Sequence, residues 1–114
     1  MFNLVLIVDD ERGIRETLRG VLEDEGFEVE TSASGEACLK SVEINNFGCI
    51  LLDVWLPNID GLETLKKLRE QGNNSAVVMI SGHGNIETAV NAIYVCPLSL
   101  KNALETNPVI RFRK

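Results

Sequence analysis

The sequence contains few cysteines, few aromatic residues and one histidine. Its three cysteines, Cys38, Cys49 and Cys96, make an odd number and lack the close paired spacing of a zinc site. We interpret them as small buried apolar residues in a reducing compartment. The cysteine pattern therefore predicts neither a disulfide framework nor a thiolate metal site, and it favours the cytoplasm.

Long apolar runs and an excess of positive charge are also missing. No apolar run reaches the length that spans a bilayer, and no basic segment precedes an apolar one near Met1, so we expect no membrane contact and no secretory signal. The 17 acidic residues exceed the 11 Lys and Arg, giving a formal net charge of −6. Because nucleic acid is bound through basic surfaces, we expect no direct nucleic-acid binding by this chain.

Strand-like and helix-like segments alternate along the 114 residues. Apolar or alternating runs predict strands at 4–8, 27–31, 49–53 and 76–80. Apolar residues at helical spacing predict helices at 12–25, from Ser34 to about 45–46, from Asp60 to Gly72 and after Asn85. In the helix after Asp60 the expected apolar stripe is Leu62, Leu65 and Leu68. This alternation predicts one α/β domain: a parallel sheet with right-handed crossovers and helices on both faces.

Carboxylates follow two of the predicted strands. Asp9 and Asp10 come directly after the apolar run at 4–8, and Asp53 ends the run at 49–53. If the two strands are neighbours, the three acids converge at the carboxyl edge of the sheet, where ligands of open α/β sheets bind. Such a group of hard oxygen ligands suits Mg²⁺, which takes one or two carboxylates together with water and phosphate oxygens. Asp53 is then a candidate phosphoryl acceptor.

Three motifs, each at the end of a predicted strand, resemble those of the receiver domains of bacterial two-component response regulators. They are Val8-Asp9-Asp10-Glu11, Leu52-Asp53-Val54-Trp55-Leu56-Pro57 leading to Asp60-Gly61, and Met79-Ile80-Ser81-Gly82-His83-Gly84. The run from Ser81 to Val90 resembles more narrowly the receivers of sigma-54-dependent activators of the nitrogen-regulation type. This narrower resemblance implies that the natural protein continues past Lys114 into an effector ATPase and a DNA-binding part.

The resemblance implies a flavodoxin-like (CheY-like), doubly wound parallel sheet of strand order 2-1-3-4-5. It also implies a reaction in which Asp53 accepts a phosphoryl group from a sensor histidine kinase with the help of Mg²⁺. By the family's pattern the metal ligands are Asp10, Asp53 and the backbone carbonyl of Trp55, with Asp9 acting through water. The resemblance also implies that Ser81 hydrogen-bonds a phosphoryl oxygen. The domain is then not an enzyme beyond its own phosphorylation and dephosphorylation.

The chain departs from the family pattern after Ile93. The family has a lysine directly before a proline at the end of its fifth strand, whereas Cys96 precedes Pro97 here, and Lys101 is too far along to replace it readily. The fifth strand and last helix are accordingly expected to be shortened or altered. Three explanations remain open: a degenerate receiver, a last third that folds differently by exchange with a second copy in a homodimer, or segments missing from the given chain. We assign residues 1–106 to the receiver. For 107–114 we favour the start of a linker over an extended segment on the sheet edge.

Two other function classes compete with a phosphoacceptor switch. An aspartyl phosphohydrolase places a second acid two positions after its nucleophile, where this chain has Trp55. A phosphate-independent interaction module is supported by the missing lysine alone. His83, between two glycines, is interpreted as an exposed loop residue because no second imidazole or thiol partner is evident.

Overall fold

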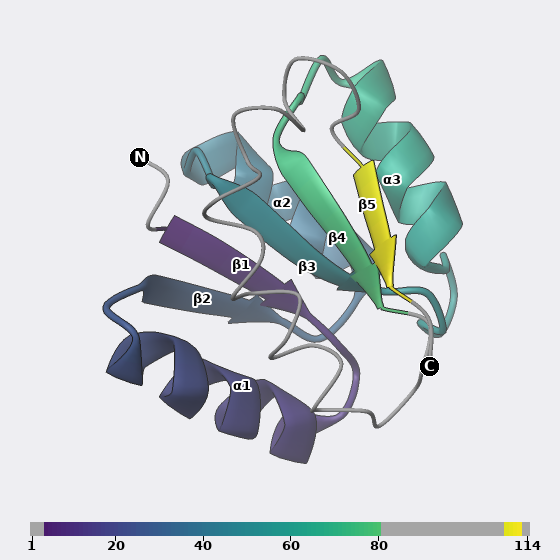
Figure 1. Cartoon of the computed structure of the whole chain (residues 1–114). Helices are drawn as coiled ribbons and strands as arrows, with labels where there is room; N and C mark the ends of the chain where they lie inside the picture. The colour runs from purple at the N-terminus through teal and green to yellow at the C-terminus, as the bar shows by residue number, and fades with distance from the viewer. Residues whose placement is uncertain (1–3, 81–108, 113–114) are drawn as a thin grey trace.

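The computed structural model describes residues 4–80 and 109–112 as an α/β sandwich (Figure 1). Five strands form one sheet: β1 (Leu4–Val8), β2 (Glu28–Ser32), β3 (Cys49–Asp53), β4 (Ala76–Ile80) and β5 (Val109–Phe112). The helices are α1 (Arg12–Asp24), α2 (Gly35–Ile44) and α3 (Gly61–Glu70). Each of the strands and helices predicted up to residue 80 is present, with ends within about two residues of those expected, the usual scatter at element boundaries.

The sheet has the order β2-β1-β3-β4-β5 and all its pairs are parallel. The predicted order is therefore confirmed for β1 to β4. β3 is buried along its whole length, whereas β2 lies at an edge and has one exposed and two half-buried residues, as its alternating sequence indicated. Val8 of β1 is in register with Leu52 of β3. The residues that follow these two, Asp9 and Asp53, are consequently neighbours at the carboxyl edge of the sheet.

Two apolar cores lie on opposite faces of the sheet. One face of β1 contributes Val5 and Ile7 to the core under α1, and the other contributes Leu6 and Val8 to the core under α2 and α3. Figure 1 shows the three helices around the sheet, with α1 on one side of it and α2 and α3 on the other. Because strand side chains alternate between faces, one run of apolar residues serves both cores. The cores hold rigid the strand ends that carry the acids.

The helices follow the sequence pattern with one exception. α1 buries Ile14, Leu18 and Leu22 against the sheet, as their spacing predicted. In α3 the prediction for Leu62 was wrong: its side chain is 47% exposed, and Thr64 is fully buried in its place. Thr64 can be buried because its hydroxyl oxygen is hydrogen-bonded: it donates to the carbonyl of Asp60 at 2.7 Å. The side chain also packs beside Gly35 of α2. No helix in the described residues is both long and apolar enough to cross a membrane.

The end of the chain forms a strand. Val109–Phe112 pair in parallel with β4, so the preference for a linker over a sheet-edge segment was wrong for these four residues. The run carries Val109, Ile110 and Phe112, residue types that favour strands, but nothing local in the sequence shows that a strand edge is available to pair with them. The predicted helix after Asn85, the short strand at 94–96 and the helical turns at 98–105 lie outside the described residues.

Candidate phosphoacceptor and metal site

Three carboxylates meet at the carboxyl ends of β1 and β3. Asp9, Asp10 and Asp53 each offer an oxygen, and these oxygens lie within 4.8 Å of one another. Asp9 and Asp53 are buried at 9% and 3% exposure, whereas Asp10 is exposed at the rim. The predicted convergence of the three acids is therefore confirmed. Like charges this close repel one another unless a cation or protons compensate them.

The two buried acids are oriented in the same way. The backbone N–H of Glu11 donates to Oδ1 of Asp9 at 2.8 Å, and the N–H of Trp55 donates to Oδ1 of Asp53 at 3.1 Å. In both cases the donor is the backbone N–H two positions after the acid. Aspartate readily makes this kind of local hydrogen bond with the backbone that follows it. Each carboxylate is thereby held against the turn that leaves its strand, so both side chains are preorganised at the edge.

The loop after Asp53 returns to pack on the strand end. The N–H of Gly61 donates to the carbonyl of Val54 at 2.9 Å, which closes the loop at the start of α3. A Cβ at Gly61 would meet the backbone carbonyl oxygen of Asp53 and lie 2.8 Å from the Cα of Val54. Within the loop Asn58 adopts φ 63°, a left-handed conformation that asparagine tolerates better than most residues. The sequence placed Gly61 only as part of a motif and did not reveal this contact.

The start of α3 is capped by Asp60. The carboxylate of Asp60 accepts a hydrogen bond from the backbone N–H of Glu63 at 2.8 Å. An aspartate at this position satisfies one of the amide groups that have no partner within the helix. The cap and the close approach of Gly61 together determine where the loop from Asp53 ends.

Arg15 is a contributor that the sequence analysis missed. Its guanidinium Nη1 donates to the backbone carbonyl of Asp9 at 2.8 Å, from one turn inside α1. Side chains of a helix lean toward its N-terminus, so an arginine in the first turns of α1 can reach back to the end of β1. The spacing of six positions between Asp9 and Arg15 was the only signal of this contact in the sequence. The contact ties α1 to the strand end that carries the acidic pair.

The response regulator receiver domain family matches residues 5–95, which is most of the chain. The chain belongs to this family. The fold is thus that of a receiver domain, and the suspected resemblance is confirmed.

Named relatives of this receiver domain include nitrogen regulators. It is 45% identical over 91 residues to the nitrogen assimilation regulatory protein NtrX of Azorhizobium caulinodans, covering 78% of this chain and 20% of that protein. The crystal structure of the receiver domain of NtrX from Brucella abortus matches 90% of this chain and 98% of that domain, with 38% identity and a TM-score of 0.68. The chemotaxis regulator CheY4 of Vibrio cholerae matches 92% of this chain and 98% of its own, with 28% identity and a TM-score of 0.68.

The chain spans about one fifth of the length of the NtrX relatives it matches. The similarity therefore covers the receiver part of longer response regulators.

Several predicted features of the receiver domain lie outside the described residues. Ser81, His83, and Cys96 with Pro97 and Lys101 are among them. Trp55 is described, and its side chain is 65% exposed beside Asp53. The role of its carbonyl as a metal ligand stays a prediction.

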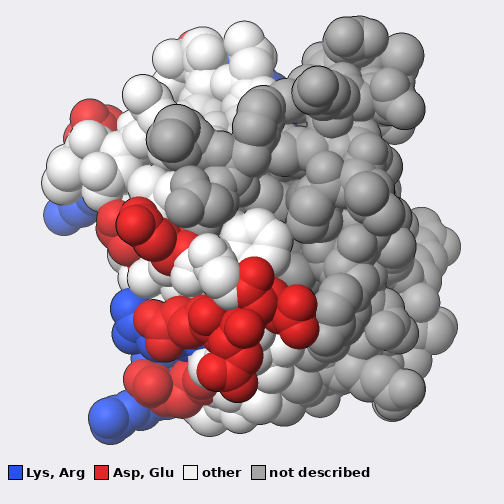
Figure 2. All heavy atoms as spheres, turned by 60° about the vertical axis from the view of Figure 1, so that its left-hand side comes forward, with Lys and Arg blue, Asp and Glu red and all other residues white. Residues whose placement is uncertain are grey.

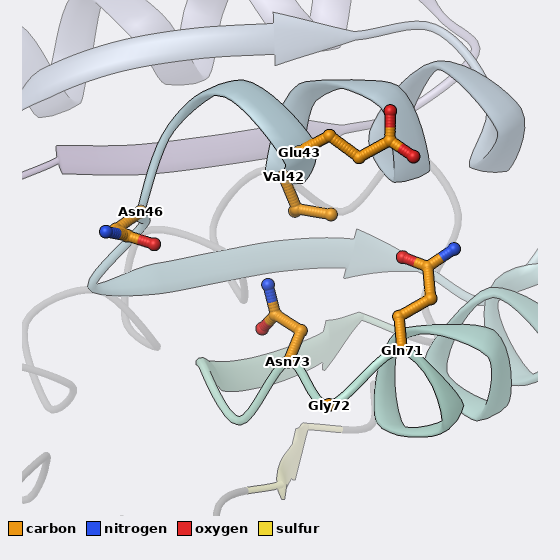
Figure 3. Close-up of a pocket in the computed structure, with 6 residues that line it drawn as sticks. All are labelled: Val42, Glu43, Asn46, Gln71, Gly72 and Asn73. Atoms are coloured by element: carbon orange, nitrogen blue, oxygen red, sulfur yellow. The ribbon is translucent and has the colours of Figure 1, made fainter.

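A cavity lies away from the acids. A cavity of about 460 Å³ is lined by residues at and after the ends of α2 and α3: Val42, Glu43, Asn46, Gln71, Gly72 and Asn73 (Figure 3). Since Asp60 and Gly61 lie at the opposite end of α3, this cavity is at the other edge of the sheet from the acidic cluster. It carries no concentration of titratable groups and is not the candidate site.

Acidic side chains also gather on the surface. In Figure 2 most of them form a band below the middle of the described part of the face, with further acidic side chains above it and with Lys and Arg at the left margin.

Proposed function

We propose that this receiver domain is a phosphoacceptor: it takes a phosphoryl group from a sensor histidine kinase onto Asp53 and thereby switches a transcriptional activator. The observation that carries the proposal is the convergence of Asp9, Asp10 and Asp53 within 4.8 Å at the edge of two adjoining strands. Membership of the receiver family supports the same reaction class.

In the proposed reaction a carboxylate oxygen of Asp53 attacks the phosphorus of a phosphohistidine. The new O–P bond forms as the P–N bond breaks, and the electron pair of that bond stays on the departing imidazole. The hydrogen bond from the N–H of Trp55 holds the Asp53 carboxylate in one orientation, so little reorganisation precedes the attack. Ser81 is proposed to donate a hydrogen bond to a phosphoryl oxygen of the product.

The acidic cluster has the chemistry of a magnesium site. Three hard carboxylate oxygens close together, one at an exposed rim open to water, fit an ion that retains several water ligands. We propose Asp10, Asp53 and the carbonyl of Trp55 as direct ligands and Asp9 as a ligand through water. When bound, Mg²⁺ would neutralise charge on the transferring phosphoryl group.

The wider assignment rests on the resemblance to receivers of the nitrogen-regulation type, which the NtrX relatives support. We propose that the domain works in the cytoplasm with a sensor histidine kinase, and that its full-length protein is a sigma-54-dependent activator with an effector ATPase and a DNA-binding domain. Beyond its own phosphorylation and dephosphorylation we expect no enzymatic turnover. A homodimer formed by exchange of elements stays one of the explanations for the altered segment after Ile93.

Intact-mass measurement after incubation with acetyl phosphate and Mg²⁺ tests this proposal. We expect one added phosphoryl group on the unaltered chain, and none on Asp53→Asn or without Mg²⁺. Asp60→Asn is the matched control, because it removes a nearby carboxylate that caps α3 but keeps an oxygen able to cap. Labelling of Asp53→Asn at the unaltered rate would contradict the assignment.

A second candidate function is a degenerate receiver that binds its partner without phosphate. It is favoured by Cys96, which stands before Pro97 where the family has a lysine. A thiol cannot supply the positive charge that reaches the phosphoryl group. Equal binding of the partner by Asp53→Asn and the unaltered chain would favour this alternative.

A further inference from the structure

Arg15 contacts the main chain between the two acids at the end of β1. Its Nη1 donates to the carbonyl oxygen of Asp9 at 2.8 Å. This carbonyl belongs to the peptide group that joins Asp9 to Asp10. Because a peptide group is planar, holding its oxygen also holds the direction in which the chain enters Asp10.

Two other polar groups of Asp9 are also hydrogen-bonded. Its N–H donates to the carbonyl of Ser32 at 3.1 Å, and its Oδ1 accepts from the N–H of Glu11 at 2.8 Å. The first bond joins Asp9 to β2 and the second is local to the turn. The Arg15 hydrogen bond joins this peptide group to α1. That helix is packed on the sheet through Ile14 and Leu18.

We propose that Arg15 is a positioning residue for the cation site: it orients the Asp9–Asp10 peptide group so that both carboxylates face Asp53. The inference rests on the proposed function, since it concerns the same magnesium site. Arg15 acts through the backbone and is not itself a ligand.

The direction in which Mg²⁺ affinity changes when Arg15 is replaced distinguishes an orienting role of Arg15 from an effect of its positive charge. A guanidinium near a cation site repels Mg²⁺, so loss of its charge alone would strengthen binding. Loss of an orienting hydrogen bond has the opposite consequence, because the acids must then be ordered when the ion binds. Residues that orient metal ligands typically change metal affinity by about tenfold or more when replaced. We accordingly expect Arg15→Met to weaken Mg²⁺ binding by about tenfold.

The chain provides a matched control on the same helix. Arg19 lies one turn further along α1, and its Nη2 donates to the carbonyl of Val29 in β2 at 3.2 Å. Arg19→Met thus also removes a hydrogen bond from an α1 arginine to a strand carbonyl, but one remote from the acids. Its further contact, an ion pair with Glu23 at 3.8 Å, is partly exposed and contributes little.

The experiment is calorimetric titration of Mg²⁺ into the unaltered chain, Arg15→Met and Arg19→Met. We expect binding by the unaltered chain and Arg19→Met with equal affinity, and weaker binding by Arg15→Met. Equal or tighter binding by Arg15→Met would overturn the inference while leaving the magnesium site intact. No binding by the unaltered chain would instead overturn the proposed function.

Amide hydrogen exchange provides a readout that does not depend on the ion. In Arg15→Met the N–H of Glu11, which is bonded to Asp9, should exchange faster than in Arg19→Met; equal exchange would contradict the role. If Arg15→Met fails to fold, Arg15→Lys keeps the charge and most of the stem but loses the planar guanidinium. The lysine variant should bind Mg²⁺ more weakly than the unaltered chain, and unchanged affinity would overturn the inference.

Discussion

Gly61 lies directly against the backbone carbonyl of Asp53, so the first residue of α3 touches the residue that ends β3. The contact has a local cause, because the loop from Val54 to Asp60 must turn back within a few residues. It has a consequence for the site, because the same contact limits how far the Asp53 strand end can move. The proposed acceptor is thus held by main-chain packing as well as by its own hydrogen bond.

Replacement of Gly61 tests this packing. Gly61→Ala places a Cβ 2.8 Å from the Cα of Val54, where the neighbour is backbone and has little freedom to shift. We expect a loss of about 1–3 kcal/mol in the free energy of unfolding, measured by urea denaturation. Gly20→Ala, in the middle of α1 with nothing within 4 Å, is the control and should raise stability by about 0.5–1 kcal/mol. Equal effects of the two variants would show that the contact is unimportant.

The Asp60 cap can be separated from the Asp60 charge. Asp60→Ala removes the acceptor for the N–H of Glu63 and should lower the free energy of unfolding by roughly 0.5–2 kcal/mol. Asp60→Asn retains a side-chain oxygen and should stay close to the unaltered chain. A large loss in both variants would mean that the negative charge, and not the hydrogen bond, stabilises the start of α3.

Magnesium should stabilise the folded chain. Because the unfolded chain does not assemble the three acids, an ion concentration ten times the Kd should raise the free energy of unfolding by about 1.4 kcal/mol. Asp10→Asn should lose this gain, and without Mg²⁺ it should be more stable than the unaltered chain, since one of three mutually repelling charges is gone. Thermal unfolding with Mg²⁺ and with EDTA measures both effects. Equal stabilisation of Asp10→Asn by Mg²⁺ would contradict a role for Asp10.

Because of Cys38, we expect the free energy of unfolding to fall at high pH. It is fully buried in the core under α2, and burial raises the pKa of its thiol from 9.0 to about 12. The folded chain therefore keeps the proton that the unfolded chain loses above pH 9.0. The contribution of this thiol to the free energy of unfolding is therefore fully present below pH 9.0. Above that pH it declines, by up to about 1.4 kcal/mol per pH unit.

The control for this prediction is Cys38→Ala. It should be less stable at every pH because it leaves a cavity, but its stability should fall less steeply between pH 9 and 10.5. Urea midpoints across that range give the two slopes. Parallel slopes would mean that the thiol does not titrate differently in the two states.

The residues of the acidic site could be predicted from the sequence because each lies at the end of a short apolar run or just after it. Asp9, Asp10 and Asp53 mark the places where buried strands end, and parallel strands bring such ends to one edge. The contacts that orient the acids were not visible in the same way. Arg15 acts through a backbone oxygen and Gly61 through the absence of a side chain, and neither leaves a pattern in composition or periodicity.

The sequence by itself determined the number and type of the elements up to residue 80, the α/β class and the identity of the acids, because apolar spacing records which faces are buried. Only the tertiary structure decided that Val8 and Leu52 stand in register, that Thr64 and not Leu62 is buried in α3, and that Val109–Phe112 add a strand beside β4. These outcomes depend on which segments meet in space, and a hydrogen bond or close contact between distant segments is decided by the partner as much as by the residue itself.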